Sequence, residues 1–248
     1  MTQEYSAEAI LLTVRDCGTV DRMVTLFSRQ YGKITAVAFG ARRPKSSFAG
    51  CLQPFSHVDL LLARNRGGEC IRQCEIIHGH RKLREELPRM VYATLVAEIV
   101  TELWPENEAD SDVFELLVDV LFTLEERNPR VAAIAAAWQL LALAGFAPEY
   151  RRCVACGSVI SLPAHFNIGA GGVMCPACGG SQTNFTEGQA NLLAKFLTLD
   201  FRSPGRFTVN AAVLAELEKL LGQCLFYHLE KELKTWAFIQ RFEQPGKG

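Results

Sequence analysis

The fold of this chain is decided by the stretch Lys33-Ile-Thr-Ala-Val-Ala-Phe39, which Gly40 ends. Polar and apolar residues alternate at its start, the period-2 pattern of a half-buried β-strand, and glycine is a turn signal. Other short apolar runs bounded by turn residues are Glu8–Val14, Met23–Phe27, His57–Leu62 and Glu69–Ile77. Strands of this length and spacing, within roughly 70 residues, predict a small closed antiparallel β-barrel.

Beyond residue 80 the apolar residues recur at helical spacing. From Leu87 an apolar residue returns every four positions as far as Leu103, and Trp104-Pro105 ends the pattern. Further helices are expected after an N-cap at Asp110 or Ser111, over Arg130–Ala144, from Thr186 to about Leu199, and from Asn210 through Trp236. Consecutive helices with short connections predict a packed helical domain.

Composition narrows the class of protein. The chain has 248 residues, of which 49% are hydrophobic and 21% are charged, so disordered and collagen-like classes are excluded. No run approaches the roughly 18 apolar residues of a membrane span. Residues Met1–Glu8 lack the basic start and apolar run of a signal peptide. We therefore expect a cytoplasmic protein that has no membrane association.

Charge is distributed unevenly along the chain. The formal net charge is −1, but residues 1–90 carry +5, residues 91–150 carry −9 and residues 151–248 carry +3. The net charge of the whole chain gives no argument for nucleic-acid binding. The uneven distribution of charge between its parts suggests modules with different partners. The alternative is that the acidic helices simply have solvated outer faces. The predicted class is α+β, with a barrel at 1–80, helical parts at 81–150 and 186–248, and a cysteine module at 151–185.

The strongest chemical motif is Cys153-Val-Ala-Cys156, followed after 18 residues by Cys175-Pro-Ala-Cys178. Two such pairs at this separation place four thiolates around a tetrahedral ion, the pattern of zinc ribbons. Gly157 and Gly179 follow the pairs and let backbone amides turn toward the sulfurs. The segment has few large apolar side chains, so it needs the metal to fold. We predict one structural Zn²⁺ per chain.

Other interpretations of the cysteines are weaker. A redox dithiol needs only one pair and a βαβ context, and an iron–sulfur cluster is less favoured by two matched pairs. His165 could replace a cysteine, but four cysteines already complete the shell, which also disfavours a catalytic zinc. An odd number of cysteines without an export signal argues against a disulfide framework. The remaining thiols are interpreted as structural: Cys17, Cys51, Cys70, Cys74 and Cys224.

The second motif is the basic loop Gly40-Ala-Arg-Arg-Pro-Lys-Ser-Ser47. Arginine, lysine and serine side chains suit phosphate oxygens, although a basic loop alone is more often a solvated turn. The surrounding barrel adds further cations and aromatic residues on which bases could stack. The predicted DNA-binding residues are Arg22, Lys33, Arg42, Arg43, Lys45, Arg64 and Arg66, and the candidate stacking residues are Tyr31, Phe39, Phe48 and Phe55.

Several of these segments resemble the RecO family of bacterial recombination mediators. The matching residues are Ala9-Ile-Leu-Leu12, Asp21-Arg-Met-Val-Thr-Leu-Phe27, Gly32-Lys33, Val37-Ala-Phe-Gly-Ala-Arg-Arg43 and Leu52-Gln-Pro-Phe55. The resemblance is closest over residues 5–80, and the later helices and cysteine pairs extend it over most of the chain. It implies an N-terminal OB-fold and a helical domain that contains a zinc module.

The resemblance also implies a function. Family members bind single- and double-stranded DNA, anneal complementary strands, and work with RecR to load RecA on DNA coated by single-strand-binding protein, at the nucleoid. No common catalytic motif is present in the sequence, and His78-Gly-His80 is interpreted as an exposed strand–helix junction. We therefore expect a non-enzymatic DNA-binding mediator.

Two other function classes stay open. The first is an adaptor for the acidic, apolar tail of single-strand-binding protein, with incidental DNA binding. The second, a zinc-dependent nuclease or deaminase, requires an open metal position.

Overall fold

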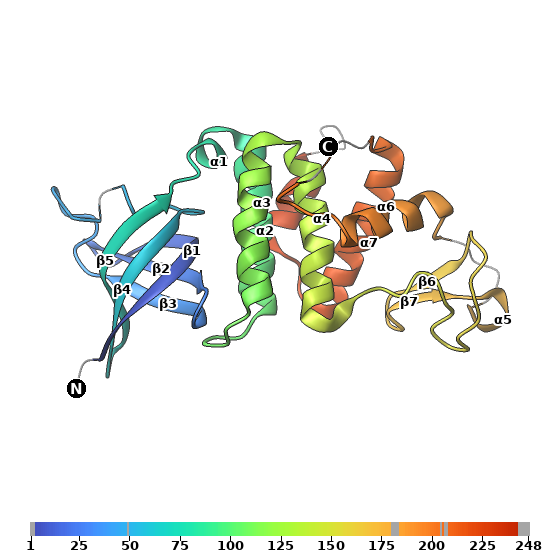
Figure 1. Ribbon diagram of the computed structural model, residues 1–248, viewed down its shortest axis with the longest axis horizontal. Coiled ribbons are helices and arrows are strands. Elements are labelled where there is room, and N and C mark those ends of the chain that lie inside the picture. Colours follow the sequence, from blue (N-terminus) through green and yellow to red (C-terminus); the bar gives the residue numbers. More distant parts are fainter. Residues whose placement is uncertain (1–2, 49, 180–183, 204, 206–207, 243–248) are drawn as a thin grey trace. The chain divides into compact units, whose positions relative to one another are not determined.

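The computed structural model describes residues 3–48, 50–179, 184–203, 205 and 208–242. The chain forms two compact units, Met1–Pro129 and Arg130–Gly248. Unit 1 contains a five-stranded barrel and helices α1 to α3, and unit 2 contains helices α4 to α8 and a two-stranded sheet (Figure 1). The change from strands to helices falls at residue 80, as expected. The helices of residues 81–150 are nevertheless divided between the two units.

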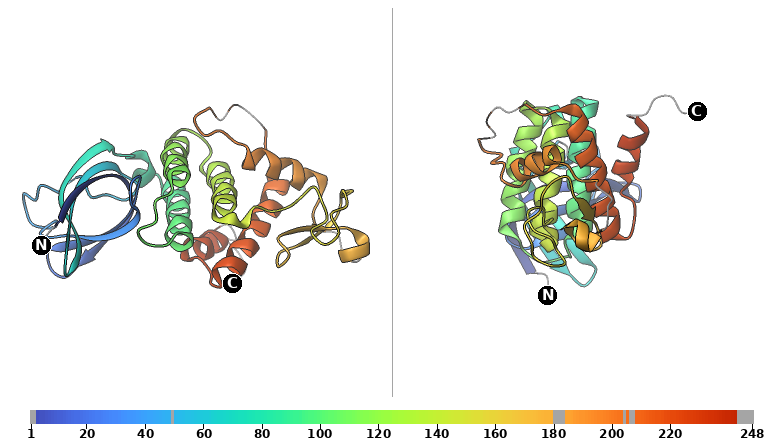
Figure 2. Two further views of the ribbon diagram at one scale, coloured as in Figure 1. Left: turned by 60° about the horizontal axis from the view of Figure 1, so that its bottom comes forward. Right: turned by 90° about the vertical axis from the view of Figure 1, so that its right-hand side faces the viewer.

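The barrel of unit 1 is an OB-fold. Its strands are β1 (Gln3–Cys17), β2 (Asp21–Ser28), β3 (Gly32–Ala38), β4 (His57–Asn65) and β5 (Gly68–His78). They close in the order β1-β2-β3-β5-β4, with β4 pairing back on β1, and curve around one interior (Figure 2). The predicted barrel is confirmed, except that β3 and β5 pair in parallel and not antiparallel. This is the five-stranded Greek-key arrangement.

Alternation along the strands produces the barrel core. In β3, the side chains of Ile34, Ala36 and Ala38 are buried, while Thr35 between them is exposed. The same alternation places Leu11, Leu26, Val58, Leu60 and Leu62 inside the barrel. Each large aliphatic side chain buried in this way contributes about 1.5–3 kcal/mol to folding.

The helices of unit 1 are α1 (Lys82–Glu85), α2 (Leu87–Leu103) and α3 (Ser111–Glu126). The carboxylate of Asp110 accepts hydrogen bonds from the N–H groups of Asp112 and Val113, so the predicted N-cap is confirmed. The backbone N–H of Asn107, between α2 and α3, donates to the carbonyl of Lys33 over 2.8 Å. The barrel and the α2–α3 turn are therefore joined through their backbones.

In unit 2, α4 (Pro129–Leu141) is the most buried helix. Its residues 132–138 are at most 4% exposed, which explains their alanine-rich composition, and π-helix η1 (Ala142–Phe146) follows it. The stretch Pro129–Phe146 has a mean hydropathy of 1.4, enough for a membrane span by length and composition alone. Half of it is buried within the protein, however, and a core helix has the same composition.

The remaining helices of unit 2 are α6 (Glu187–Leu197), α7 (Ala211–Leu229) and α8 (Lys234–Phe242). The capping box of Thr186 and the N-cap of Asn210 are both confirmed. The prediction of one long helix through Trp236 is wrong, because the chain reverses at Glu230, which has φ +55°. A Cβ on Gly222 of α7 would lie 2.6 Å from the Trp236 ring, so the reversal packs α8 back on α7 at a glycine.

Candidate metal centre and nucleic-acid interface

Two short turns bring the four cysteines of the metal motif together. Cys153 and Cys156 lie in the loop before strand β6 (His165–Asn167). Cys175 lies between strand β7 (Gly172–Met174) and helix α5 (Pro176–Gly179), and Cys178 lies in α5. The N–H groups of Gly157 and Gly179 each donate to the carbonyl of the first cysteine of their pair, both over 2.8 Å. As a result, the sulfur atoms of Cys153, Cys156, Cys175 and Cys178 all lie within 4.8 Å of one another.

The distances in this quartet fit a tetrahedral ion. The Sγ atoms of Cys156 and Cys175 are 3.8 Å apart. In a tetrahedron with Zn–S bonds of about 2.3 Å, the sulfurs are separated by about 3.8 Å. His165 lies on β6 but is not part of the cluster, so the predicted set of four thiolates is what the structure brings together. Residues 180–183 of the 151–185 module lie outside the described residues.

The surroundings of the sulfurs favour the thiolate at Cys153 and Cys156 and disfavour it at Cys178. The N–H of Cys175 donates to the Sγ of Cys153 over 3.3 Å and lowers the pKa of Cys153 to about 6. The hydroxyl of Ser158, 3.2 Å from the Sγ of Cys156, lowers the pKa of that thiol. The neighbouring sulfur of Cys175 instead raises the pKa of Cys178 to about 12. Four adjacent thiolates therefore need a cation among them, and the donor set suits a soft or borderline metal.

The basic loop starts from a well-anchored base. The N–H of Gly40 donates to the carboxylate of Asp21 over 2.7 Å, and the N–H of Arg42 donates to the carbonyl of Val20 over 2.8 Å. The guanidinium of Arg42 bonds the carbonyl of Thr19 over 3.2 Å and pairs with Asp16 over 3.3 Å. Arg42 therefore folds back over the β1–β2 turn.

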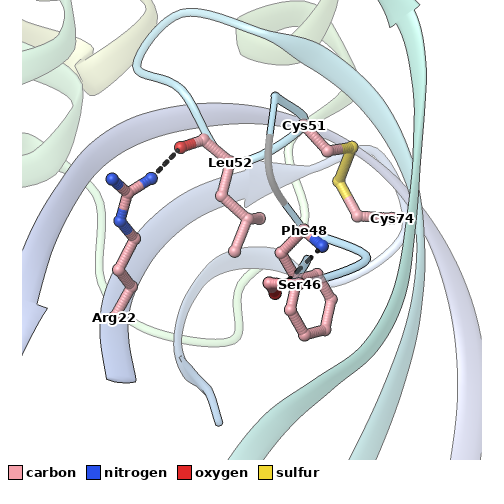
Figure 3. Close-up of a disulfide and its surroundings, with 6 residues drawn as sticks. All are labelled: Arg22, Ser46, Phe48, Cys51, Leu52 and Cys74. Carbon is pink, nitrogen blue, oxygen red and sulfur yellow. Dashed lines mark hydrogen bonds between the residues drawn. A yellow bond between two sulfur atoms is a disulfide. The ribbon is translucent and has the colours of Figure 1, made fainter. Parts of the chain in front are cut away.

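The far end of the loop is anchored as well (Figure 3). The N–H of Phe48, a buried residue, donates to the hydroxyl of Ser46 over 3.3 Å. The guanidinium of Arg22 donates to the carbonyl of Leu52 over 2.9 Å. A disulfide joins Cys51 to Cys74 on β5. The segment between Arg42 and Ser46 is therefore a tip held from both sides.

This disulfide corrects the prediction that Cys51 and Cys74 are separate structural thiols. Their Cα atoms are 6.2 Å apart, within the range that a disulfide spans. The two residues are separated by 23 positions, and only the folded barrel shows that they meet. Cys17, Cys70 and Cys224 are free thiols, as expected.

Breaking this crosslink should destabilise unit 1. A disulfide that closes a loop of 23 residues removes unfolded-chain entropy worth about 3 kcal/mol. We expect Cys51→Ser to lower the free energy of unfolding by about that amount relative to the oxidised protein. The measurement is hydrogen exchange of barrel peptides in the full chain, with Cys17→Ser as the control. Equal protection in oxidised protein and Cys51→Ser would contradict the prediction.

The structure separates the seven predicted DNA-binding residues into two groups. Arg43 and Lys45, at the tip of the loop, and Arg66, in the β4–β5 turn, are exposed, and within the described part of the chain their side chains have no hydrogen bond or ion pair. The other four are held by unit 1 itself. Lys33 donates to the carbonyl of Thr101 in the last turn of α2, over 2.5 Å, and Arg64 pairs with Glu69.

Comparison with known proteins agrees with this architecture. The family model "Recombination protein O N terminal" matches residues 1–80, and "Recombination protein O C terminal" matches residues 84–237. A protein named DNA repair protein RecO, from Pelotomaculum thermopropionicum, is 37% identical over 247 residues, 98% of this chain and 96% of the relative. Proteins of the same name from Nocardioides and Symbiobacterium thermophilum are 36% and 33% identical, each covering 95% or more of both chains.

The chain belongs to the RecO family of DNA repair proteins. Within this RecO chain the N-terminal match coincides with the OB-fold barrel. The C-terminal match begins inside α1 and contains the four cysteines.

The candidate stacking residues of the barrel also fall into an exposed group and a buried group. Phe39 is 61% exposed at the start of the basic loop, and Tyr31 is partly exposed with its ring 4.7 Å from that of Tyr5. Phe48 and Phe55 are buried, so the expectation that they could stack on bases is wrong. Because their side chains are covered, they are unable to stack on a base.

Two features of the RecO chain were missed by sequence reasoning. Arg72 on β5 is exposed beside the buried Ile71, so strand alternation could have added it to the candidate cations. His80, expected to be exposed, is only 1% exposed and contacts Glu125. No local sequence pattern indicates the contact between His80 and Glu125, because the two residues are 45 positions apart.

Proposed function

We propose that this RecO-family chain is a non-enzymatic DNA-binding recombination mediator. It binds single- and double-stranded DNA, promotes annealing of complementary strands, and acts with RecR in loading RecA on DNA coated by single-strand-binding protein, in the cytoplasm at the nucleoid. The observation that carries this proposal is the loop tip Arg43-Pro44-Lys45 of an OB-fold, which presents two cations that have no partner among the described residues.

The tip is suited to phosphate binding because both of its ends are anchored to the barrel. Asp21 and Arg42 anchor one end, and the Cys51–Cys74 disulfide anchors the other, so little loop entropy is lost on binding. Guanidinium and ammonium groups neutralise phosphates without identifying bases. Neutralising two backbones reduces their repulsion and allows complementary strands to pair. The exposed ring of Phe39 adds a surface on which one base can stack.

The metal centre supports a structural role and not catalysis. We propose that Cys153, Cys156, Cys175 and Cys178 hold one Zn²⁺, which stabilises the module around them. Four protein thiolates fill a tetrahedral shell and leave no position for water or substrate. A nuclease or deaminase that depends on this centre would need such a position.

The salt dependence of DNA binding tests the proposed contacts. We expect the double variant Arg43→Ala, Lys45→Ala to reduce the slope of log affinity against log salt by about 1.4 on single strands and about 1.8 on duplex. Arg42→Ala should change the slope by less than one of these residues does, because Arg42 already pairs with Asp16. Lys195→Ala, an exposed lysine on α6, is the control. Fluorescence anisotropy with one oligonucleotide at several salt concentrations measures the slope, and an unchanged slope would remove the tip from the interface.

A second candidate function is an adaptor for the acidic, apolar tail of single-strand-binding protein. Exposed aromatic residues of unit 2 favour it, since Phe226 is 58% and Tyr227 is 52% exposed on α7. Because α2 and α3 belong to unit 1, the test uses the full chain and not a fragment that starts after the barrel. Tail-peptide binding by the Arg43→Ala, Lys45→Ala variant, combined with annealing equal to the unsubstituted protein, would favour the adaptor over the DNA-binding mediator.

A further inference from the structure

A second cluster of possible metal ligands lies in unit 1, away from the four cysteines. His78 is the last residue of β5, His80 precedes α1, and Glu125 lies in the last turn of α3. Each offers one ligand atom, and these atoms all lie within 4.8 Å of one another. Three elements that are far apart in the sequence therefore meet at two imidazoles and one carboxylate.

The contacts within this cluster are direct. The Nδ1 atom of His80 is 3.0 Å from the Oε2 atom of Glu125, and the Nε2 atom of His78 is 3.3 Å from the same oxygen. The two imidazole rings have centroids 4.3 Å apart. The ring of Phe122 lies against both, at 4.5 Å from His78 and 4.8 Å from His80. An apolar wall on one side strengthens electrostatic attraction within the cluster.

His80 carries a buried nitrogen that lacks a partner. The residue is 1% exposed. Its Nε2 atom is buried and has no hydrogen-bond partner in the described part of the chain. Such atoms are rare in folded proteins and indicate a missing ligand.

We propose that His78, His80 and Glu125 bind a divalent transition-metal ion of the Zn²⁺ class. Imidazole and carboxylate are the ligands of three-residue zinc sites, whereas Mg²⁺ and Ca²⁺ prefer oxygen. One ligand atom from each of the three residues lies within 4.8 Å of the others, so one ion can reach all three residues. The side chain of His78 is 42% exposed, which provides an entry path and a fourth position for water.

The ion would connect parts of unit 1 that the backbone does not connect locally. It would join the end of the barrel at β5 to the end of α3. This site differs from the cysteine quartet in its donors, which are nitrogen and oxygen and not sulfur, and in its open fourth position. It is independent of the proposed DNA contacts at Arg43 and Lys45.

The test counts metal ions in the full chain without an affinity tag. Protein equilibrated with Zn²⁺ and freed of excess metal should retain two equivalents, and His78→Gln should retain one. His78 is half-exposed at a strand end, so this variant keeps the core intact. The matched control is His228→Gln in α7, which should retain two equivalents. Glu125→Gln keeps the shape of the carboxylate, removes its charge, and should weaken binding of the second equivalent.

Cobalt substitution assigns each equivalent to its ligands. With Co²⁺, the thiolate charge-transfer absorption of the quartet should persist in His78→Gln, while the absorption of the nitrogen–oxygen site should disappear. Thermal unfolding of unit 1 should shift upward with added Zn²⁺ in the unsubstituted protein and not in His78→Gln. A single equivalent bound only by thiolates in the unsubstituted protein, or equal metal content in His78→Gln and His228→Gln, would overturn the proposal.

Discussion

Removal of the proposed Zn²⁺ from the cysteine quartet, by chelation or by Cys175→Ser, is expected to unfold the module around residues 151–185. Its regular structure is two strands of three residues and one helix of four, and its buried side chains are few, including Phe166, Val173 and Phe185. So small a core is unable to hold the segment by itself. Structural zinc contributes about 10–16 kcal/mol in isolated finger peptides, far more than this core supplies.

Two measurements check this expectation. Hydrogen exchange should show loss of protection in the module, while α4 and α7 keep theirs. A thiol reagent should react with four additional cysteines after chelation, and with the three remaining cysteines of the quartet in Cys175→Ser. Cys17→Ser is the control, since this free thiol lies on β1 in the other unit. Full protection of the module in metal-free protein would contradict the prediction. An unchanged salt slope of DNA binding after metal removal would agree with a purely structural role for the ion.

Substitution of Gly32 by alanine is expected to cost unit 1 about 4 kcal/mol. Gly32 has φ +66°, and a Cβ there would lie 1.8 Å from the backbone oxygen of Glu108, in the turn between α2 and α3. A left-handed conformation costs alanine about 1–2 kcal/mol, and the displacement of a packed backbone adds about 1–3 kcal/mol. The added methyl group would force the barrel away from this turn.

The chain contains a matched control for this substitution. Gly18 has φ +58°, but no atom lies within 4 Å of a Cβ built there. Gly18→Ala should therefore cost only the conformational part, about 1–2 kcal/mol. Urea unfolding monitored by hydrogen exchange of unit 1 peptides gives both values. If the two variants are destabilised equally, the close approach of Gly32 to the Glu108 backbone does not contribute to stability. That result would contradict the prediction.

The basic residues of the barrel show how much residue type alone can predict about a DNA-binding surface. Sequence composition identified seven basic candidates, but only Arg43, Lys45 and Arg66 are both exposed and unpaired among the described residues. Lys33 compensates the carbonyl end of α2 at Thr101, which is a favourable place for a cation. Whether a charged side chain faces solvent or another element depends on residues distant in the sequence.

The features that could be predicted from the sequence are those whose signals are local. Alternation predicted the barrel strands, and the spacing of the cysteine pairs predicted the quartet. Cap residues predicted three helix starts, at Asp110 or Ser111, at Thr186 and at Asn210. These patterns act within a few residues, because a cap or a pleat depends on neighbours along the chain. Each is therefore readable without knowledge of the fold.

The pairings between residues distant in the sequence became visible in the folded protein alone. It joined Cys51 to Cys74, placed His80 against Glu125, and attached the α2–α3 pair to the barrel at Gly32. A residue's type limits which partners it can take but does not indicate which one lies nearby. That choice depends on how strands and helices pack, because the free energy of burial is shared over the whole unit and is not encoded at any single position.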